Sequence, residues 1–169
     1  HDPLTGLANV RLGRDRLQAA FDAAEQAASR VALFFIDLDG FKAINDAFGH
    51  EAGDHVLKVV AERLTECIRS SDTAVRHGGD EFLVIVNAVR DRATSARIGR
   101  NLLDTIARPI FFKRVRFSVG ASIGVAIASR IGGTMETVLR CADAALYRAK
   151  RDGRARFRLF TPEMDDVLR

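Results

Sequence analysis

The stretch RHGGDEF at residues 76–82 leads directly into the apolar run LVIV at residues 83–86. The apolar run predicts a buried strand. A Gly-Gly pair fits a tight hairpin turn, in which the backbone adopts positive φ or approaches a ligand closely. Such a turn would hold the carboxylates of Asp80 and Glu81 rigidly at the start of the strand, where they can present a metal ion or a phosphate. The alternative is a solvated turn before a strand, because short motifs also occur by chance.

A second acidic segment follows another apolar run. Residues 31–36 are continuously apolar and precede the sequence DLDGFK at residues 37–42. A strand this apolar is expected to be buried on both faces, which places Asp37 at its end, where ligands of sheet proteins often bind. If this strand and the strand after Asp80 are neighbours, the two carboxylates can share a hard cation. Mg²⁺ suits that arrangement, since it is held by one or two carboxylates plus substrate phosphates.

Helix and strand patterns alternate along the chain, with no internal repeat and no low-complexity segment. Apolar residues at helical spacing predict helices over residues 10–28, 57–68, 98–106 and 135–149, with a short helix around 42–48. Strands are predicted at residues 31–36, 73–76, 82–86 and 156–160, and two further strands, bent or paired around Gly120, within 111–127. Gly153 is the expected stop of the helix over 135–149. This order is compatible with a βααββαβ α/β sandwich.

Composition indicates a single ordinary domain. The chain has 169 residues, of which 47% are hydrophobic, so it can bury a sizeable core. Its formal net charge of +4 is spread along the sequence without an aromatic–basic platform, which favours a small polyanion such as a nucleotide over nucleic acid. Cys67 and Cys141 lie in apolar helical patterns and are expected to be reduced core residues. No segment reaches the length of a membrane span and no signal sequence is present, so we expect a cytoplasmic domain without membrane contact.

Six blocks of the sequence, in the right order, resemble the GGDEF family of diguanylate cyclases. The blocks are DPLTGLAN at 2–9, DLDGFKAIND at 37–46, GHEAGD at 49–54, GGDEF at 78–82, SIGVA at 122–126, and ALYRAK at 145–150 followed by Gly153 and Arg154. The resemblance covers nearly the whole chain and implies that residues 1–160 form a GGDEF domain. It also implies a ferredoxin-like core around a central, mostly antiparallel sheet, the architecture shared with nucleotide cyclases and polymerase palms.

Both ends of the chain resemble junctions within longer proteins of this family. Residues 160–166 (FTPEMDD) are similar to segments that lead from GGDEF domains into EAL phosphodiesterase domains, so residues 161–169 are expected to begin a linker toward a downstream EAL domain. The start of the chain is where the connecting helix of a sensory domain would normally enter. A membrane-anchored full-length protein is compatible with this arrangement.

The resemblance implies a reaction and a set of metal ligands. A diguanylate cyclase joins two GTP molecules into cyclic di-GMP: the 3′-hydroxyl of one attacks the α-phosphate of the other, and pyrophosphate leaves. The active form would be a homodimer with two Mg²⁺ or Mn²⁺ ions per active site. By analogy, Asp37, Asp80 and the backbone carbonyl of Leu38 are metal ligands. Glu81 is either a second metal contact or the general base for the 3′-hydroxyl, and Asp39 is either a further ligand or a structural hydrogen-bonding residue.

Two segments are expected to bind the phosphates of GTP. Gly40 and Phe41 lie between a strand and a helix start, where free backbone N–H groups favour anions, and Lys42 can assist them or remain solvated. Lys150 and Arg154, at the end of the helix over 135–149, match family positions that contact phosphate. The alternative for these two residues is that they complement the dipole at a helix C-terminus.

Guanine recognition and product control are assigned to two further pairs of residues. Asn45 and Asp54 match the guanine readers of the family and provide the hydrogen-bonding groups that the base requires; the alternative for Asp54 is a helix cap. Arg69 and Asp72 form an Arg-x-x-Asp pattern that resembles the family's inhibitory site for cyclic di-GMP, where the Arg pairs with phosphate or guanine. The alternative for this pattern is an ordinary ion pair at a helix end.

A function of a different class also fits the sequence. The domain could be a catalytically weak module that binds GTP or cyclic di-GMP and regulates an attached domain, such as an EAL phosphodiesterase. Intact Asp80 and Glu81, together with Lys150 and Arg154, favour the enzyme, because non-catalytic relatives often lose these residues.

Overall fold

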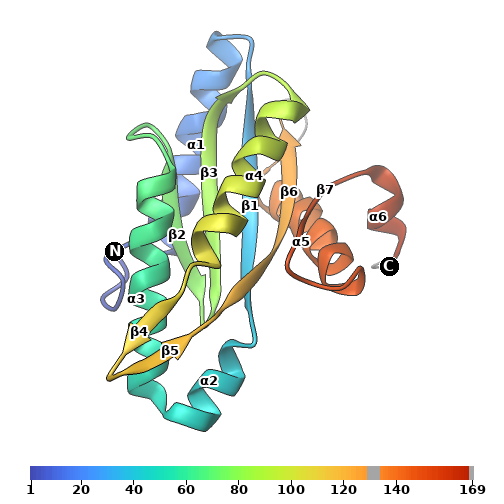
Figure 1. The fold of residues 1–169 in the computed structure, drawn as a ribbon. Coiled ribbons are helices and arrows are strands. Elements are labelled where there is room, and N and C mark those ends of the chain that lie inside the picture. Colours follow the sequence, from blue (N-terminus) through green and yellow to red (C-terminus); the bar gives the residue numbers. More distant parts are fainter. Residues whose placement is uncertain (129–133, 168–169) are drawn as a thin grey trace.

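A five-stranded sheet between two layers of helices makes up the computed structural model, which describes residues 1–128 and 134–167 (Figure 1). The strand order is β2-β3-β1-β6-β7. The bounds are β1 Arg30–Asp39, β2 Thr73–Gly78, β3 Glu81–Val89, β6 Gly120–Ala128 and β7 Phe157–Leu159. Strand β7 runs parallel to β6, and the other pairs of this sheet are antiparallel. The predicted α/β sandwich with a central, mostly antiparallel sheet is confirmed.

Helices cover both faces of the sheet. Helices α1 (Val10–Gln26) and α5 (Met135–Arg151) cover one face, and α3 (His50–Cys67) and α4 (Arg92–Ile106) cover the other (Figure 1). On β1, Leu33 faces α1 and α5 whereas Phe34 faces α3 and α4, and both side chains are fully buried. Because side chains alternate along a strand, a sheet that is covered on both faces needs apolar residues at successive positions, as the run at residues 31–36 predicts.

Two short helices complete the layers. Helix α2 (Phe41–Phe48) connects β1 to α3, and α6 (Pro162–Val167) packs against α5 within the segment expected to be a linker. Cys67 and Cys141 are not joined in a disulfide, and each is partly buried at the edge of one of the two apolar cores. None of the helices in the described part of the chain is both long enough and apolar enough to cross a membrane.

The segment after α4 differs from the prediction. The sequence predicts two strands around Gly120, but the structure has three: a separate hairpin of β4 (Ile110–Phe112) and β5 (Val115–Phe117), and then β6, which begins at Gly120. The hairpin turns at Lys113 and Arg114, which have φ of 46° and 68°. A turn with positive φ at both central residues normally carries Gly, Asn or Asp. The two basic residues therefore provide no turn signal in the sequence.

Two predicted boundaries are wrong. Strand β1 continues to Asp39, because its backbone pairs with β3 and β6 on either side and the ladder keeps it extended. Asp37 therefore lies inside the strand rather than at its end. Helix α1 ends at Gln26, and Ala28 lies outside it with φ of 52°, a backbone conformation that cannot continue a right-handed helix.

Candidate active site

Pairing of β1 with β3 brings the predicted carboxylates together at one end of the sheet. Gly79, with φ of 46°, lies in the turn between β2 and β3, and Asp80 follows it directly before β3. Asp37 on β1 lies opposite Glu81, the first residue of β3. The backbone N–H of Leu38 donates a hydrogen bond of 3.2 Å to the carbonyl of Asp80. The predicted hairpin turn is confirmed, and the structure meets the condition that the strand of Asp37 and the strand after Asp80 are neighbours.

The carboxylates concentrate negative charge. Burial raises the pKa of the Asp80 carboxyl, and the nearby charges of Asp37 and Glu81 raise it further. Lys150, in the last turn of α5, forms an ion pair between its Nζ and the Asp37 carboxylate. The carboxylates at this end of the sheet therefore attract cations, and the ammonium group of Lys150 provides part of the positive charge that balances them.

The donor groups fit a divalent metal ion whose coordination is completed by substrate. Within residues 1–128 and 134–167, no group of three or more His, Cys, Asp or Glu side chains is arranged to hold a metal on its own. Asp37 and Asp80 instead offer two hard carboxylates with Glu81 beside them. Mg²⁺ and Mn²⁺ accept such ligands together with phosphate oxygens, so the residues present fit the metals that the sequence predicts.

Asp39 forms structural hydrogen bonds. Its Oδ1 accepts a hydrogen bond of 2.8 Å from the Ser122 hydroxyl, and its Oδ2 accepts one of 3.0 Å from the backbone N–H of Ala155. A guanidinium nitrogen of Arg154 lies 3.5 Å from Oδ1. These contacts tie the connector between α5 and β7 to the end of β1, which favours the hydrogen-bonding alternative for Asp39 over a metal ligand.

The predicted phosphate-binding residues surround the same end of β1. Gly40 has φ of 76° and caps the N-terminus of α2 without a side-chain hydrogen bond, and Phe41 and the exposed Lys42 begin that helix. Lys150 belongs to the last turn of α5, whereas Arg154 lies three residues beyond the helix, with φ of 64°. The backbone N–H of Arg154 still donates to the carbonyl of Ala149 in the last turn of α5, so the helix-dipole alternative stays open for this residue. Its side chain is 57% exposed, so it is accessible to a ligand.

Asn45 and Asp54 lie on either side of the junction between α2 and α3. The Oδ1 atom of Asn45 is buried and has no hydrogen-bond partner among the described residues. It lies against Gly53, where an added Cβ would come within 1.8 Å of it. Helix α3 begins at His50 with Gly49 as its N-cap, so the helix-cap alternative for the exposed Asp54 is wrong. A buried polar atom without a partner is costly, and a ligand that donates to Asn45 would remove that cost.

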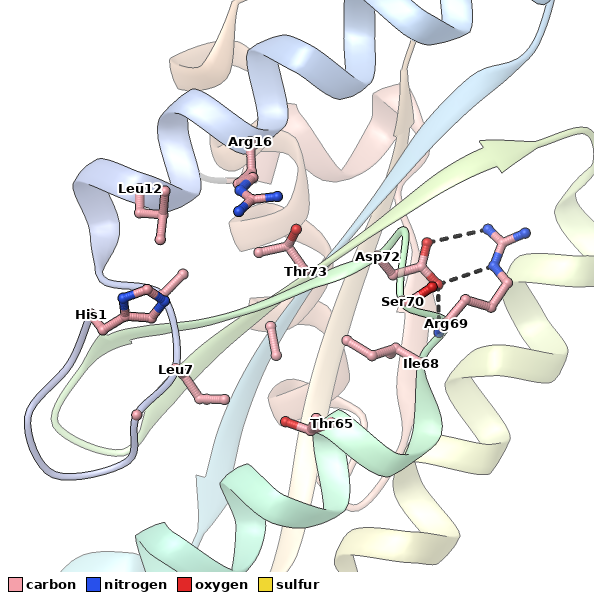
Figure 2. Close-up of a pocket in the computed structure, with 13 residues that line it drawn as sticks. His1, Leu7, Leu12, Arg16, Thr65, Ile68, Arg69, Ser70, Asp72 and Thr73 are labelled. Carbon is pink, nitrogen blue, oxygen red and sulfur yellow. Dashed lines mark hydrogen bonds and ion pairs between the residues drawn. The ribbon is translucent and has the colours of Figure 1, made fainter.

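Arg69 and Asp72 form an ion pair just beyond the C-terminus of α3. Two guanidinium nitrogens of Arg69 lie 3.2 Å from Asp72 carboxylate oxygens, and Arg69 also donates to the carbonyl of Asn87 at 2.5 Å. Arg69, Asp72 and Arg16 all line a cavity of about 520 Å³, and Figure 2 shows the guanidinium of Arg69 on the far side of Asp72 from Arg16. The six residues of β2 place this pair about 20 Å along the strand from the Asp80 turn. The helix-end ion pair, which is the alternative interpretation of this pattern, is present. Binding of cyclic di-GMP at Arg69 and Asp72 stays a prediction.

Two residues outside the predicted set contact the turn. Arg76 donates hydrogen bonds of 3.0 and 2.7 Å to the carbonyl of Gly79 and one of 3.2 Å to the Asp2 carboxylate. The Nδ1 atom of His77 lies 3.7 Å from Oε1 of Glu81. Both residues are part of the stretch at 76–82, so a signal exists in the sequence, but a motif does not indicate which way its side chains point.

Comparison with known proteins identifies similar sequences and structures. A family model described as "Diguanylate cyclase, GGDEF domain" matches residues 1–156. The bifunctional diguanylate cyclase/cyclic di-GMP phosphodiesterase MucR of Pseudomonas aeruginosa is 42% identical over 98% of this chain and 24% of its own length. The solved GGDEF domain of TpbB (YfiN) from Pseudomonas aeruginosa has a TM-score of 0.94 and 37% identity, covering 99% of this chain and 98% of that one. The GGDEF domain of DgcB from Caulobacter crescentus, in complex with c-di-GMP, has a TM-score of 0.85 and 31% identity, covering 94% of each chain.

The curated relatives are much longer than this chain. The chain spans between 20% and 24% of the length of several that it matches over nearly its whole extent. The matched region corresponds to one unit within these larger proteins.

Proposed function

The chain belongs to the GGDEF family of diguanylate cyclase domains, and we propose that it condenses two molecules of GTP into cyclic di-GMP with release of two pyrophosphates. The observation that carries the proposal is the pairing of β1 with β3, which sets Asp37 opposite Glu81 and close to Asp80. Phosphoryl transfer depends mainly on positioning and on neutralisation of charge. Clustered carboxylates beside basic side chains can provide both.

Two Mg²⁺ or Mn²⁺ ions would be held by Asp37, Asp80, Glu81 and the Leu38 carbonyl. Such ions would lower the pKa of an attacking hydroxyl and neutralise charge on the phosphates. Burial and like charge disfavour the ionised form of Asp80 in the protein alone. Bound cations would remove that penalty, so the clustered arrangement of the carboxylates favours metal binding. Glu81 either adds a metal contact or accepts the proton of the 3′-hydroxyl.

The basic residues bind the triphosphate. Lys150, which pairs with Asp37 in the structure, would turn its charge toward the phosphates if bound cations screened that carboxylate. Arg154 lies beside Asp39 with most of its side chain exposed and contacts the same phosphates. The backbone N–H groups that follow Gly40, assisted by Lys42, complete the phosphate-binding site at the N-terminus of α2.

Asn45 and Asp54 select guanine. The buried Oδ1 of Asn45 accepts a hydrogen bond from the base, and the carboxylate of Asp54 accepts from a second guanine N–H group. Adenine lacks a matching set of donors, so it would leave Asn45 without a partner, which is costly.

The reaction needs two chains. Each chain binds one GTP, so the attacking 3′-hydroxyl and the target α-phosphate lie on different subunits of a homodimer. Arg69 and Asp72 bind cyclic di-GMP away from the carboxylates and restrain this assembly. The complex of the DgcB domain with c-di-GMP supports product binding by the family.

A regulatory module is the second candidate function. MucR is described as both a cyclase and a phosphodiesterase, which favours association with a second activity. In this case residues 1–160 would bind nucleotide without turnover, and residues 161–169 would lead toward the regulated domain, such as an EAL phosphodiesterase.

Product analysis separates the two functions. The chain is incubated with GTP and Mg²⁺ over a range of protein concentrations, and cyclic di-GMP and pyrophosphate are quantified. The enzyme produces them in a ratio of one to two, with specific activity that rises with protein concentration, because dimers form by mass action. Saturable binding of GTP without either product would overturn the enzymatic function in favour of the module, and concentration-independent specific activity would overturn the two-chain mechanism.

A further inference from the structure

His77 lies beside the proposed catalytic carboxylates without a role in the proposed function. Its ring packs edge-to-face against Phe35, with ring centroids 5.1 Å apart and an interplanar angle of 65°. The Nδ1 atom is buried and has no hydrogen-bond partner among the described residues. The nearest charged group recorded for that atom is Oε1 of Glu81, at 3.7 Å. Phe35 therefore fixes the ring, and Nδ1 lies on the side of Glu81.

Glu81 has room to move. Its side chain is 37% exposed and lines a cavity of about 480 Å³ between the sheet and α5, together with His77 and Arg140. A long carboxylate side chain at the rim of such a cavity has several rotamers, and ordering it costs free energy. Catalysis through Glu81 consequently needs a second contact that selects the productive position.

We propose that His77 is a positioning residue whose Nδ1–H donates a hydrogen bond to Glu81 and holds its carboxylate toward Asp37 and Asp80 in the nucleotide complex. The inference rests on the proposed function, in which Glu81 acts on the metal or on the 3′-hydroxyl. A separation of 3.7 Å is too long for a hydrogen bond, and contacts of this kind commonly tighten when substrate binds. The hydrogen bond would also give the buried Nδ1 its missing partner.

Two substitutions separate positioning from packing, because they remove opposite parts of the side chain. His77→Asn keeps an amide nitrogen near the place of Nδ1 but loses the ring, and His77→Phe keeps the ring against Phe35 but loses the donor. Positioning predicts that His77→Phe lowers kcat by about 10- to 100-fold with KM for GTP unchanged, and that His77→Asn retains more activity. A kcat for His77→Phe equal to that of the wild type, with the larger loss in His77→Asn, would overturn the inference in favour of packing.

A double-mutant cycle and a spectrum complete the test. In a Glu81→Ala background, His77→Phe should cause no further loss of kcat, since the two residues act as one unit. Independently of turnover, the long-range ¹H–¹⁵N spectrum of the imidazoles at neutral His77 should show the Nδ1–H tautomer, assigned by its loss in His77→Asn and shifted in Glu81→Ala. An Nε2–H tautomer would refute the inference even if the chain makes no cyclic di-GMP, whereas absence of product in the wild type alone refutes the proposed function.

Discussion

Asp2 and Arg76 are joined by an ion pair of 3.2 Å, although 74 positions separate them in the sequence. The same guanidinium donates two hydrogen bonds to the carbonyl of Gly79, directly before Asp80. Both partners are largely buried, with side chains 17% and 15% exposed. One arginine therefore anchors the first turn of the chain and the turn that carries the proposed metal ligand.

Substitution of this arginine should lower turnover more than stability. Arg76→Lys keeps the charge but loses the planar fork that reaches Asp2 and Gly79 together. We expect kcat to fall by about tenfold through misplacement of Asp80, with the circular dichroism spectrum retained. Arg14→Lys, which alters an exposed ion pair with Glu136, is the matched control and should leave kcat unchanged. Wild-type kcat in Arg76→Lys would show that the anchor does not position the turn.

The Asp2 carboxylate should make folding depend on pH in the acid range. Burial alone would raise the pKa of Asp2, but hydrogen bonds from Thr5 and the charge of Arg76 outweigh burial and lower it below the ordinary value of 3.8. A carboxyl with a lowered pKa stabilises the fold above pH 3.8, and this contribution is lost as the pH falls through the folded-state pKa. Thermal midpoints of the wild type and Asp2→Asn should differ near neutral pH and converge in acid. A difference that does not change with pH would contradict this linkage.

Guanine selectivity should depend on the contact between Asn45 and Gly53. The Cβ introduced by Gly53→Ala would lie 1.8 Å from Asn45 Oδ1, and the obstructing atom is the end of a side chain, which can move away. We expect a raised KM for GTP and a reduced preference for GTP over ATP, with the fold intact. Ala47→Ser, on the exposed surface of α2, is the control. Equal turnover of GTP and ATP by the wild type would mean that Asn45 and Asp54 are misassigned.

Product inhibition should depend on Arg69. Its side chain is 59% exposed, and its guanidinium pairs with Asp72 at the opposite end of β2 from the catalytic turn. Arg69→Ala should relieve inhibition by added cyclic di-GMP and leave the initial rate unchanged. Arg16→Ala, on the other side of Asp72 (Figure 2), controls for loss of a nearby positive charge. Initial rates with and without added cyclic di-GMP measure the effect. Unchanged inhibition in Arg69→Ala would show that Arg69 is not part of an inhibitory site for cyclic di-GMP.

The sequence was sufficient to predict the strands and the turn that carry the carboxylates, whereas the pairing of β1 with β3 that brings them together is seen only in the structure. Apolar runs before Asp37 and after Asp80 predict two buried strands, and the Gly-Gly pair predicts the hairpin between β2 and β3; both follow from local chemistry. The Lys113–Arg114 turn could not be predicted, because both central residues have positive φ although neither is a Gly, Asn or Asp.

Side-chain partners were also beyond the reach of the sequence. The pairing of Lys150 with Asp37 depends on where α5 ends relative to β1, and the position of Arg154 depends on where α5 stops. The proximity of His77 to Glu81 depends on the rotamers of both residues and on the ring of Phe35. The Lys150–Asp37 and Phe35–His77 contacts join elements far apart in the chain. His77 and Glu81 are only four residues apart, but the motif that contains them does not indicate which way their side chains point.

The measurement that tests the central claim most directly is cyclic di-GMP formation from GTP and Mg²⁺ by Asp80→Asn. The substitution keeps the size of the side chain and removes one ligand charge, and it also removes like-charge repulsion with Asp37, so the thermal midpoint should not fall. The account predicts a loss of turnover of about 100-fold or more, while Asp46→Asn, exposed on α2, retains wild-type turnover. Full cyclase activity in a folded Asp80→Asn variant would contradict the claim that the Asp37–Asp80 pair forms the catalytic metal site.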